Sequence, residues 1–164
     1  MRILGVDPGT AICGWGIVDR LGSTTKPVAF GAIRTSSGVP MEKRLLHIFE
    51  SLSALIGEHQ PDYAAVERLY FGQNSATALA VGQARGVVLL ALAQRGLTLV
   101  EMTPNEVKQT VTGYGMASKA QMQAMVQRLL SLSKKPTPDD AADALAIALT
   151  GIEYIRFKGV IHDR

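Results

Sequence analysis

The order of strand-like and helical segments constrains the fold of this chain more than any other sequence feature. Apolar β-type runs lie at residues 2–7, 14–18, 28–33, 63–66 and 97–102, and helical patterns cover residues 41–59, 74–94, 103 onward, 118–132 and 138–153. Three successive strands with short connections predict an antiparallel meander, and the later alternation of helix and strand predicts further strands in the same sheet. We therefore predict an α/β fold, with a mixed five-stranded sheet flanked by helices.

Length and composition favour one soluble domain. The chain has 164 residues, of which 47% are hydrophobic, so it can bury a core and is not disordered. The single cysteine, Cys13, excludes an internal disulfide and a multi-cysteine metal site. We find neither a secretory signal nor a membrane-spanning run, and expect a cytoplasmic location without membrane contact. We expect the domain to cover residues 1–153 and a tail to cover residues 154–164.

Charge is unevenly distributed along the chain. The net charge is only +3. Residues 1–84 are neutral, residues 85–135 carry seven basic and two acidic side chains, and residues 136–164 carry three basic and five acidic ones. A basic segment followed by an acidic one suits a polyanion held beside metal-binding carboxylates, although solvated helix faces would give the same counts.

Four carboxylates occupy positions that suggest chemistry. Asp7 ends the first predicted strand and Glu67 ends the fourth, so both side chains reach one edge of the sheet if these strands are neighbours. Asp140 and Asp143 share a face of the last helix. Such a cluster is costly without cations, and oxygen ligands favour Mg²⁺ or Mn²⁺, one or two ions per subunit. Alternatively, these residues shape a turn or lie on solvated surfaces.

Several segments together resemble the RuvC family of Holliday-junction resolvases. They read ILGVDPGT, VERLYFGQNSATALAVGQARG, EMTPNEVKQTVTGYGMASKAQMQAMVQRLL and DDAADALAIAL, and they span residues 1 to about 150. The resemblance implies an RNase H-like fold and a homodimeric, metal-dependent endonuclease that cuts four-way DNA junctions symmetrically during recombination and repair. It also implies that Asp7, Glu67, Asp140 and Asp143 are the catalytic, metal-binding acids, whereas we assign Asp139 to helix capping. A RuvA–RuvB branch-migration complex is an implied partner.

The resemblance extends to predicted DNA-binding residues. Lys108 and Lys119 match family lysines that lie close to the phosphates near the active site; each is otherwise an ordinary surface lysine. The family places an aromatic side chain that stacks on junction bases at Tyr70 or Phe71, although one of the pair could belong to the core. Arg85 faces either DNA or the interior, and the sequence leaves both directions open.

The long helix at residues 74–94 has small and apolar side chains that suit close packing. They include Ala78, Leu79, Val81, Gly82 and Gly86, which pack either against the sheet of one subunit or across the dimer implied by the resemblance. Two other functions are alternatives. A nucleotide-binding half of the sugar-kinase or actin type shares a DPGT-like loop but needs a second domain, and a non-catalytic junction-binding module would lack at least one acid.

Overall fold

The computed structural model describes residues 1–68 and 75–158, which form a five-stranded sheet covered by helices. The strands are β1 (Arg2–Asp7), β2 (Ile12–Leu21), β3 (Thr24–Arg34), β4 (Tyr63–Glu67) and β5 (Thr98–Met102), in the order β3-β2-β1-β4-β5. β1, β2 and β3 pair antiparallel, whereas β4 is parallel to both β1 and β5. The predicted meander and the predicted mixed sheet are confirmed.

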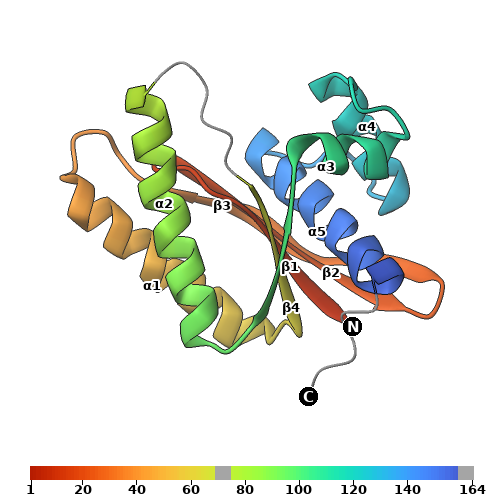
Figure 1. Ribbon diagram of the computed structural model, residues 1–164, viewed down its shortest axis with the longest axis horizontal. Coiled ribbons are helices and arrows are strands. Elements are labelled where there is room, and N and C mark those ends of the chain that lie inside the picture. Colours follow the sequence, from red (N-terminus) through yellow and green to blue (C-terminus); the bar gives the residue numbers. More distant parts are fainter. Residues whose placement is uncertain (69–74, 159–164) are drawn as a thin grey trace.

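Helices cover both faces of this sheet. They are α1 (Met41–His59), α2 (Ser75–Gln94), α3 (Pro104–Thr112), α4 (Lys119–Leu129) and α5 (Asp139–Lys158). Figure 1 shows α1 and α2 on one side and α3, α4 and α5 on the other. Two hydrophobic cores result: alternate residues of β1 point to opposite faces, so Ile3 packs with the α3–α5 layer and Leu4 with α1 and α2. None of the described helices is long and apolar enough to cross a membrane.

The α5 helix lies unusually close to the sheet because the facing residues are small. Gly5 of β1 faces Ala144 and Ala148, and Gly14 of β2 faces the backbone of Asp140. A Cβ atom at either glycine would overlap a carbonyl oxygen of α5, so only glycine permits this approach. The first turns of α5 are thereby held against the ends of β1 and β2, and the position of its acidic residues is fixed by packing.

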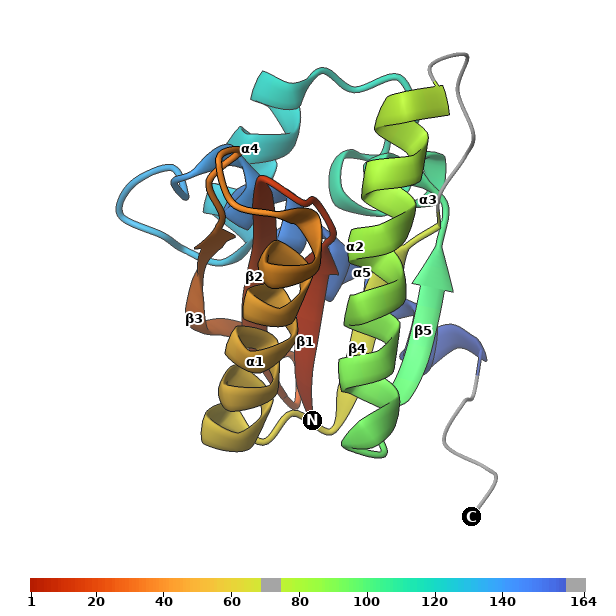
Figure 2. The same ribbon diagram turned by 90° about the vertical axis from the view of Figure 1, so that its left-hand side faces the viewer.

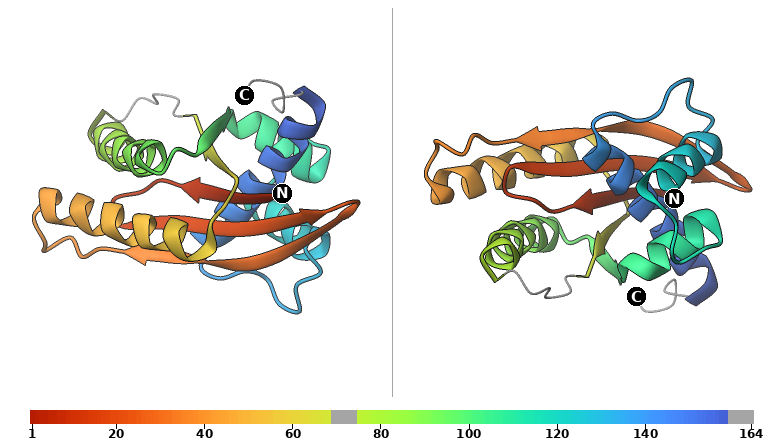
Figure 3. Two further views of the ribbon diagram at one scale, coloured as in Figure 1. Left: turned by 90° about the horizontal axis from the view of Figure 1, so that it is seen from below. Right: turned by 90° about the horizontal axis from the view of Figure 1, so that it is seen from above.

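Some predicted boundaries are wrong. The polar stretch at residues 19–26 does not separate two short strands, because β2 continues to Leu21 and β3 begins at Thr24. Views from below and above show the resulting long hairpin running across the molecule (Figure 3). The last helix extends past its expected end at Glu153 to Lys158, because Ile155 still packs in the core.

Candidate active site

Two of the predicted acids meet at one edge of the sheet. β1 and β4 are parallel neighbours, with Val6 beside Val66, so Asp7 and Glu67 both follow at the carboxyl ends of adjacent strands. In Figure 2 this edge is at the top, where the strands β1, β4 and β5 point. The expectation that the first and fourth strands are neighbours is confirmed. In doubly wound sheets this edge is the usual place for a functional site.

The α5 helix brings a third acid to the same place. Asp7, Glu67 and Asp143 line a cavity of about 310 Å³. Asp140 is not among the lining residues, although it lies near enough to affect the charge of Asp7. Its backbone is fixed over Gly14, the residue paired with Asp7 across the β1–β2 ladder. Three of the four predicted acids therefore share the cavity and the fourth lies at its side.

These carboxylates destabilise one another's charged forms. Burial, followed by the charges of Asp143, Glu67 and Asp140, raises the pKa of Asp7 from 3.8 to about 7. Burial and then Asp143 also raise the pKa of Glu67, which nearby Lys108 partly offsets. The pKa of Asp143 is raised as well, chiefly by burial, against the opposing effect of Lys119. The cavity is therefore a site of concentrated negative charge that a bound cation would relieve.

Lys119 contacts one acid that lines the cavity, Asp143, and one at its rim, Asp139. Its ammonium group lies 3.4 Å from an oxygen of Asp143 and 3.5 Å from an oxygen of Asp139. The other oxygen of Asp139 accepts a hydrogen bond of 2.8 Å from the side-chain amide of Gln123. Burial would lower the pKa of Lys119, but the two carboxylates outweigh it and keep the lysine charged. This network joins the start of α4 to the start of α5.

The cavity also has a second lysine and an apolar wall. Lys108 of α3 and Lys119 of α4 both line the cavity. Both lysines therefore lie near the acids, where the resemblance to the family implies that they should be. A capping box begins α3: the Thr103 side chain accepts from the Glu106 backbone N–H, and the Glu106 side chain accepts from the Thr103 backbone N–H. The remaining lining residues are mostly apolar: Pro104, Val107, Ala117, Met122, Ala146 and Ile147.

The donors suit a divalent cation in kind. Carboxylate oxygens from β1, β4 and α5 are the hard ligands that Mg²⁺ prefers, and their raised pKa values reflect mutual repulsion that a cation would remove. Within residues 1–68 and 75–158, no three acidic, histidine or cysteine side chains already lie close enough together to form a ready-made metal site. The residues therefore fit Mg²⁺ by the chemistry of their oxygen donors.

The other predicted DNA-binding residues do not line this cavity. Tyr70 and Phe71 lie outside the described residues. Arg85 points toward the sheet, where its guanidinium group pairs with Glu101 of β5 and its side chain is mostly buried. Of the two directions that the sequence left open for Arg85, the structure has the inward one.

Sequence reasoning missed two features of the site. An ion pair and a hydrogen bond connect Asp139 of α5 with Lys119 and Gln123 of α4. No spacing pattern in the sequence predicts these contacts, because they join two different helices. The loop between α3 and α4, which lies between Lys108 and Lys119 in the chain, exposes Tyr114 and Met116.

Fold and site together define an RNase H-like α/β domain with an acidic cavity at the carboxyl edge of its sheet. Residues 3–151 match the family model of the crossover junction endodeoxyribonuclease RuvC. The chain is 57% identical over 149 residues to the RuvC of Chloroflexus aggregans, covering 91% of each chain. It is 50% identical over 160 residues to that of Brevibacillus brevis, covering 98% and 96%. The chain belongs to the RuvC family of crossover junction endodeoxyribonucleases.

Solved structures agree with this assignment. A Thermus thermophilus RuvC in complex with a Holliday junction substrate superimposes with a TM-score of 0.91 and 33% identity, covering 96% of each chain. The yeast mitochondrial Holliday junction resolvase Ydc2, at 15% identity and a TM-score of 0.67, is similar in fold. The predicted fold class and enzyme class are thus confirmed.

Proposed function

We propose that this enzyme resolves four-way DNA junctions by symmetric, Mg²⁺-dependent hydrolysis of phosphodiester bonds, with Mn²⁺ as a substitute metal. The observation that carries the proposal is the cavity in which Asp7, Glu67 and Asp143 meet two lysines. Acids alone would repel DNA, and lysines alone would only bind it. Their combination suits a phosphodiester that must be both held and cut.

The residues divide the work between them. Asp7, Glu67, Asp140 and Asp143 would hold one or two divalent ions, which supply an activated water and neutralise the leaving oxygen. Lys108 and Lys119 offset the charge of the phosphate and fix its position beside the acids. The apolar wall of the cavity forms its remaining lining beside these charged groups. Tyr70 or Phe71 remains a proposed stacking contact to junction bases.

Cleavage of a synthetic junction tests this assignment. We expect the wild-type protein to cut a four-way junction with Mg²⁺, to be inactive in EDTA, and to prefer the junction over an excess of linear duplex. Glu67→Gln should abolish cleavage and retain binding. Glu58→Gln, the same change at an exposed residue of α1, should be fully active. Junction binding without cleavage by the wild-type protein in Mg²⁺ would instead indicate a non-catalytic junction-binding module.

A homodimer is proposed because symmetric cleavage needs two active sites related by a two-fold axis. The exposed side of α2 supports it. Leu79 and Leu90 are 66% and 61% exposed. Gln83 and Gly86 lie between them and are also exposed, so the exposed positions follow one another at intervals of four, three and four residues. This is the spacing of a coiled-coil seam, and Gly86 leaves open space for a close approach.

The mass of the protein in solution tests the dimer. We expect light scattering to give twice the chain mass of 17.5 kDa. Leu90→Glu should give monomers, because it places a charge in the proposed seam. Leu46→Glu, at an exposed leucine of α1, should leave the dimer intact. A wild-type monomer at the concentrations used for cleavage would refute the proposed interface.

Two cellular proposals follow from the family. We expect the protein to act in the cytoplasm, because four-way junctions of a bacterial chromosome arise there. A RuvA–RuvB complex is a proposed partner, since branch migration would bring the junction to a favourable cleavage position. Co-purification of the three proteins on a junction would test that partnership.

A further inference from the structure

The connection between α3 and α4 exposes two large apolar side chains. Tyr114 is 59% exposed and Met116 is 77% exposed, although both belong to a segment of only a few residues. They are neighbours on one short connection, and Met116 is more exposed than Tyr114. In Figure 2 the connection runs along the top of the molecule, at the end of the sheet to which β1, β4 and β5 point.

Hydrogen bonds hold this loop in one shape. The backbone N–H of Tyr114 donates to the Thr112 hydroxyl at 3.1 Å, and the one proton of that hydroxyl lies between the Lys108 carbonyl at 2.8 Å and the Tyr114 carbonyl at 3.0 Å. The backbone N–H of Ala117 donates to the Tyr114 carbonyl at 3.1 Å. Gly115 packs so closely on Asn105 of α3 that a Cβ atom there would overlap the Asn105 amide. The loop therefore presents Tyr114 and Met116 from a fixed backbone.

The residues on both sides of the loop line the acidic cavity. Lys108 precedes it on α3, and Ala117 and Lys119 follow Met116 directly in the chain. The apolar pair thus lies in the chain between two lysines of the cavity, and Met116 directly precedes a residue that lines it.

We propose that Tyr114 and Met116 form a contact surface for unstacked nucleobases at the junction crossover, beside the strand to be cut. The inference rests on the proposed function. Apolar side chains gain nothing from phosphates, which the lysines bind, but a tyrosine ring stacks on any base and a thioether packs against its edge. Bases at a crossover are the accessible ones, because duplex bases are already stacked. The loop therefore adds a preference for open crossover geometry that the cavity alone does not supply.

Equilibrium binding in EDTA tests this proposal, because it measures recognition without cleavage. Tyr114→Ala should weaken junction binding roughly tenfold in fluorescence anisotropy, whereas Tyr114→Phe should bind within about twofold of wild type. Met116→Ala should have a smaller effect. Phe157→Ala, which truncates an 81% exposed aromatic of α5 outside the cavity, is the matched control and should bind normally. Linear duplex binding should be unchanged in all variants.

The dependence of binding on salt separates stacking from charge. Tyr114→Ala should leave the slope of log affinity against log salt unchanged, whereas Lys108→Ala should reduce it by about one. A 2-aminopurine base at the crossover should be less quenched by the Tyr114→Ala protein than by wild type. Normal junction binding by Tyr114→Ala, or a changed slope, would overturn the proposal while leaving the nuclease assignment intact. Failure of the wild-type protein to cut junctions would overturn the nuclease assignment and this inference with it.

Discussion

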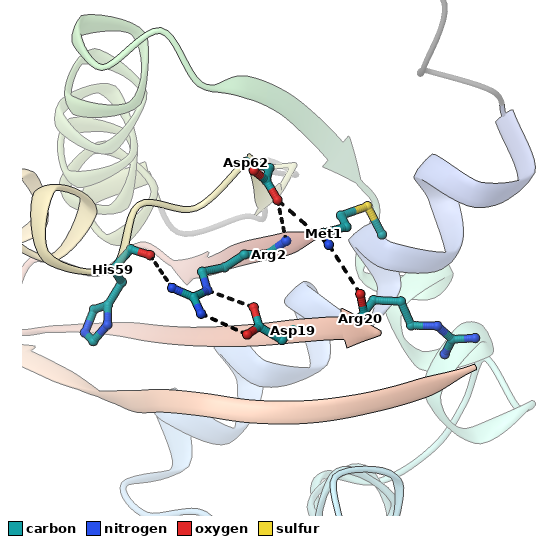
Figure 4. Close-up of polar contacts among 6 residues, drawn as sticks. All are labelled: Met1, Arg2, Asp19, Arg20, His59 and Asp62. Carbon is teal, nitrogen blue, oxygen red and sulfur yellow. Dashed lines mark hydrogen bonds and ion pairs between the residues drawn. The ribbon is translucent and has the colours of Figure 1, made fainter. Parts of the chain in front are cut away.

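The two ends of β1 carry charged clusters of opposite character. At its start, the guanidinium group of Arg2 donates to both oxygens of Asp19 at 2.8 Å and to the His59 carbonyl at 2.7 Å. Asp62 accepts from the Arg2 backbone at 2.6 Å (Figure 4). At its end, Asp7 lines the acidic cavity together with Glu67 and Asp143, and Asp140 lies at the side of that cavity. One cluster is internally matched and the other is not.

The pKa values express this difference. The hydrogen bonds from Arg2 lower the pKa of Asp19, so its charge stabilises the fold. Burial and neighbouring acids raise the pKa of Asp7 to about 7, so its charge opposes folding. Matched charges at the start of β1 tie β1 to β2 and to the end of α1. The carboxylates at the other end raise one another's pKa values, a cost that is expected if they bind the proposed cation.

The largest expected effect is loss of cleavage at the acidic end. Asp7→Asn should reduce junction cleavage in Mg²⁺ by about 1,000-fold or more, since it removes a ligand at the centre of the acid cluster, and this corresponds to about 4 kcal/mol. Asp19→Asn, the same chemical change in the matched cluster, should cleave normally. Quantitative cleavage of a labelled junction at matched protein concentrations distinguishes the two. Equal activity of both variants would remove Asp7 from the active site.

The second prediction concerns stability without metal. Because the pKa of Asp7 is raised by folding, the folded protein binds a proton that the unfolded chain releases, and stability falls as pH rises from about 4 to about 7. Asp7→Asn removes this loss and should raise the unfolding free energy at pH 8 by about 2 to 4 kcal/mol.

Urea unfolding in EDTA between pH 4 and pH 8 checks this, and the gain should shrink toward pH 4. Asp19→Asn should have the opposite sign: its lowered pKa means that stability is present at neutral pH and is lost as pH falls through that pKa. Destabilisation by Asp7→Asn at pH 8 would contradict the proposed cost of the acidic cluster.

The third prediction breaks the matched cluster. Arg2→Ala should lower the unfolding free energy by about 2 kcal/mol, because it removes two hydrogen bonds to the Asp19 carboxylate and one to the His59 carbonyl. Junction cleavage per folded molecule should be unchanged. Arg156→Ala, which removes an exposed pair with Glu153, is the control and should cost well under about 1 kcal/mol. Thermal melting of the three proteins in EDTA measures the difference.

Local sequence patterns predicted what depends on neighbours in the chain. Asp7 and Glu67 were predicted from their positions at the ends of two strands, and Asp140 and Asp143 from their separation by three residues on one helix. The pairing of β1 with β4 confirms that Asp7 and Glu67 lie at the same edge of the sheet. The hairpin was predicted poorly, because Asp19 and its polar neighbours look like a turn in sequence while forming the solvent side of a twisted ribbon. A polar strand residue has a local signal identical to that of a loop residue.

Long-range pairing had no sequence signal. Arg2 and Asp19 meet only because β1 and β2 pair in one particular register, and Lys119 meets Asp143 only because α4 packs on α5. Arg85 remained ambiguous for the same reason, since its partner Glu101 belongs to a strand that follows α2 in the chain. Charge counts identified a basic and an acidic segment but could not say which lysine faces which acid.

The smallest predicted effect concerns the rim of the acidic cavity. Asp139 carries the same charge as Asp143 and contacts the same ammonium group, but it is exposed and does not line the cavity. Asp139→Asn should therefore cost about 0.5 kcal/mol of stability and reduce cleavage less than about threefold. Asp143→Asn should abolish cleavage, although it removes an interaction of similar length. Comparison of both variants in one junction assay tests whether position in the cavity, rather than contact with Lys119, decides function. A loss as large as that of Asp143→Asn would place Asp139 among the catalytic acids.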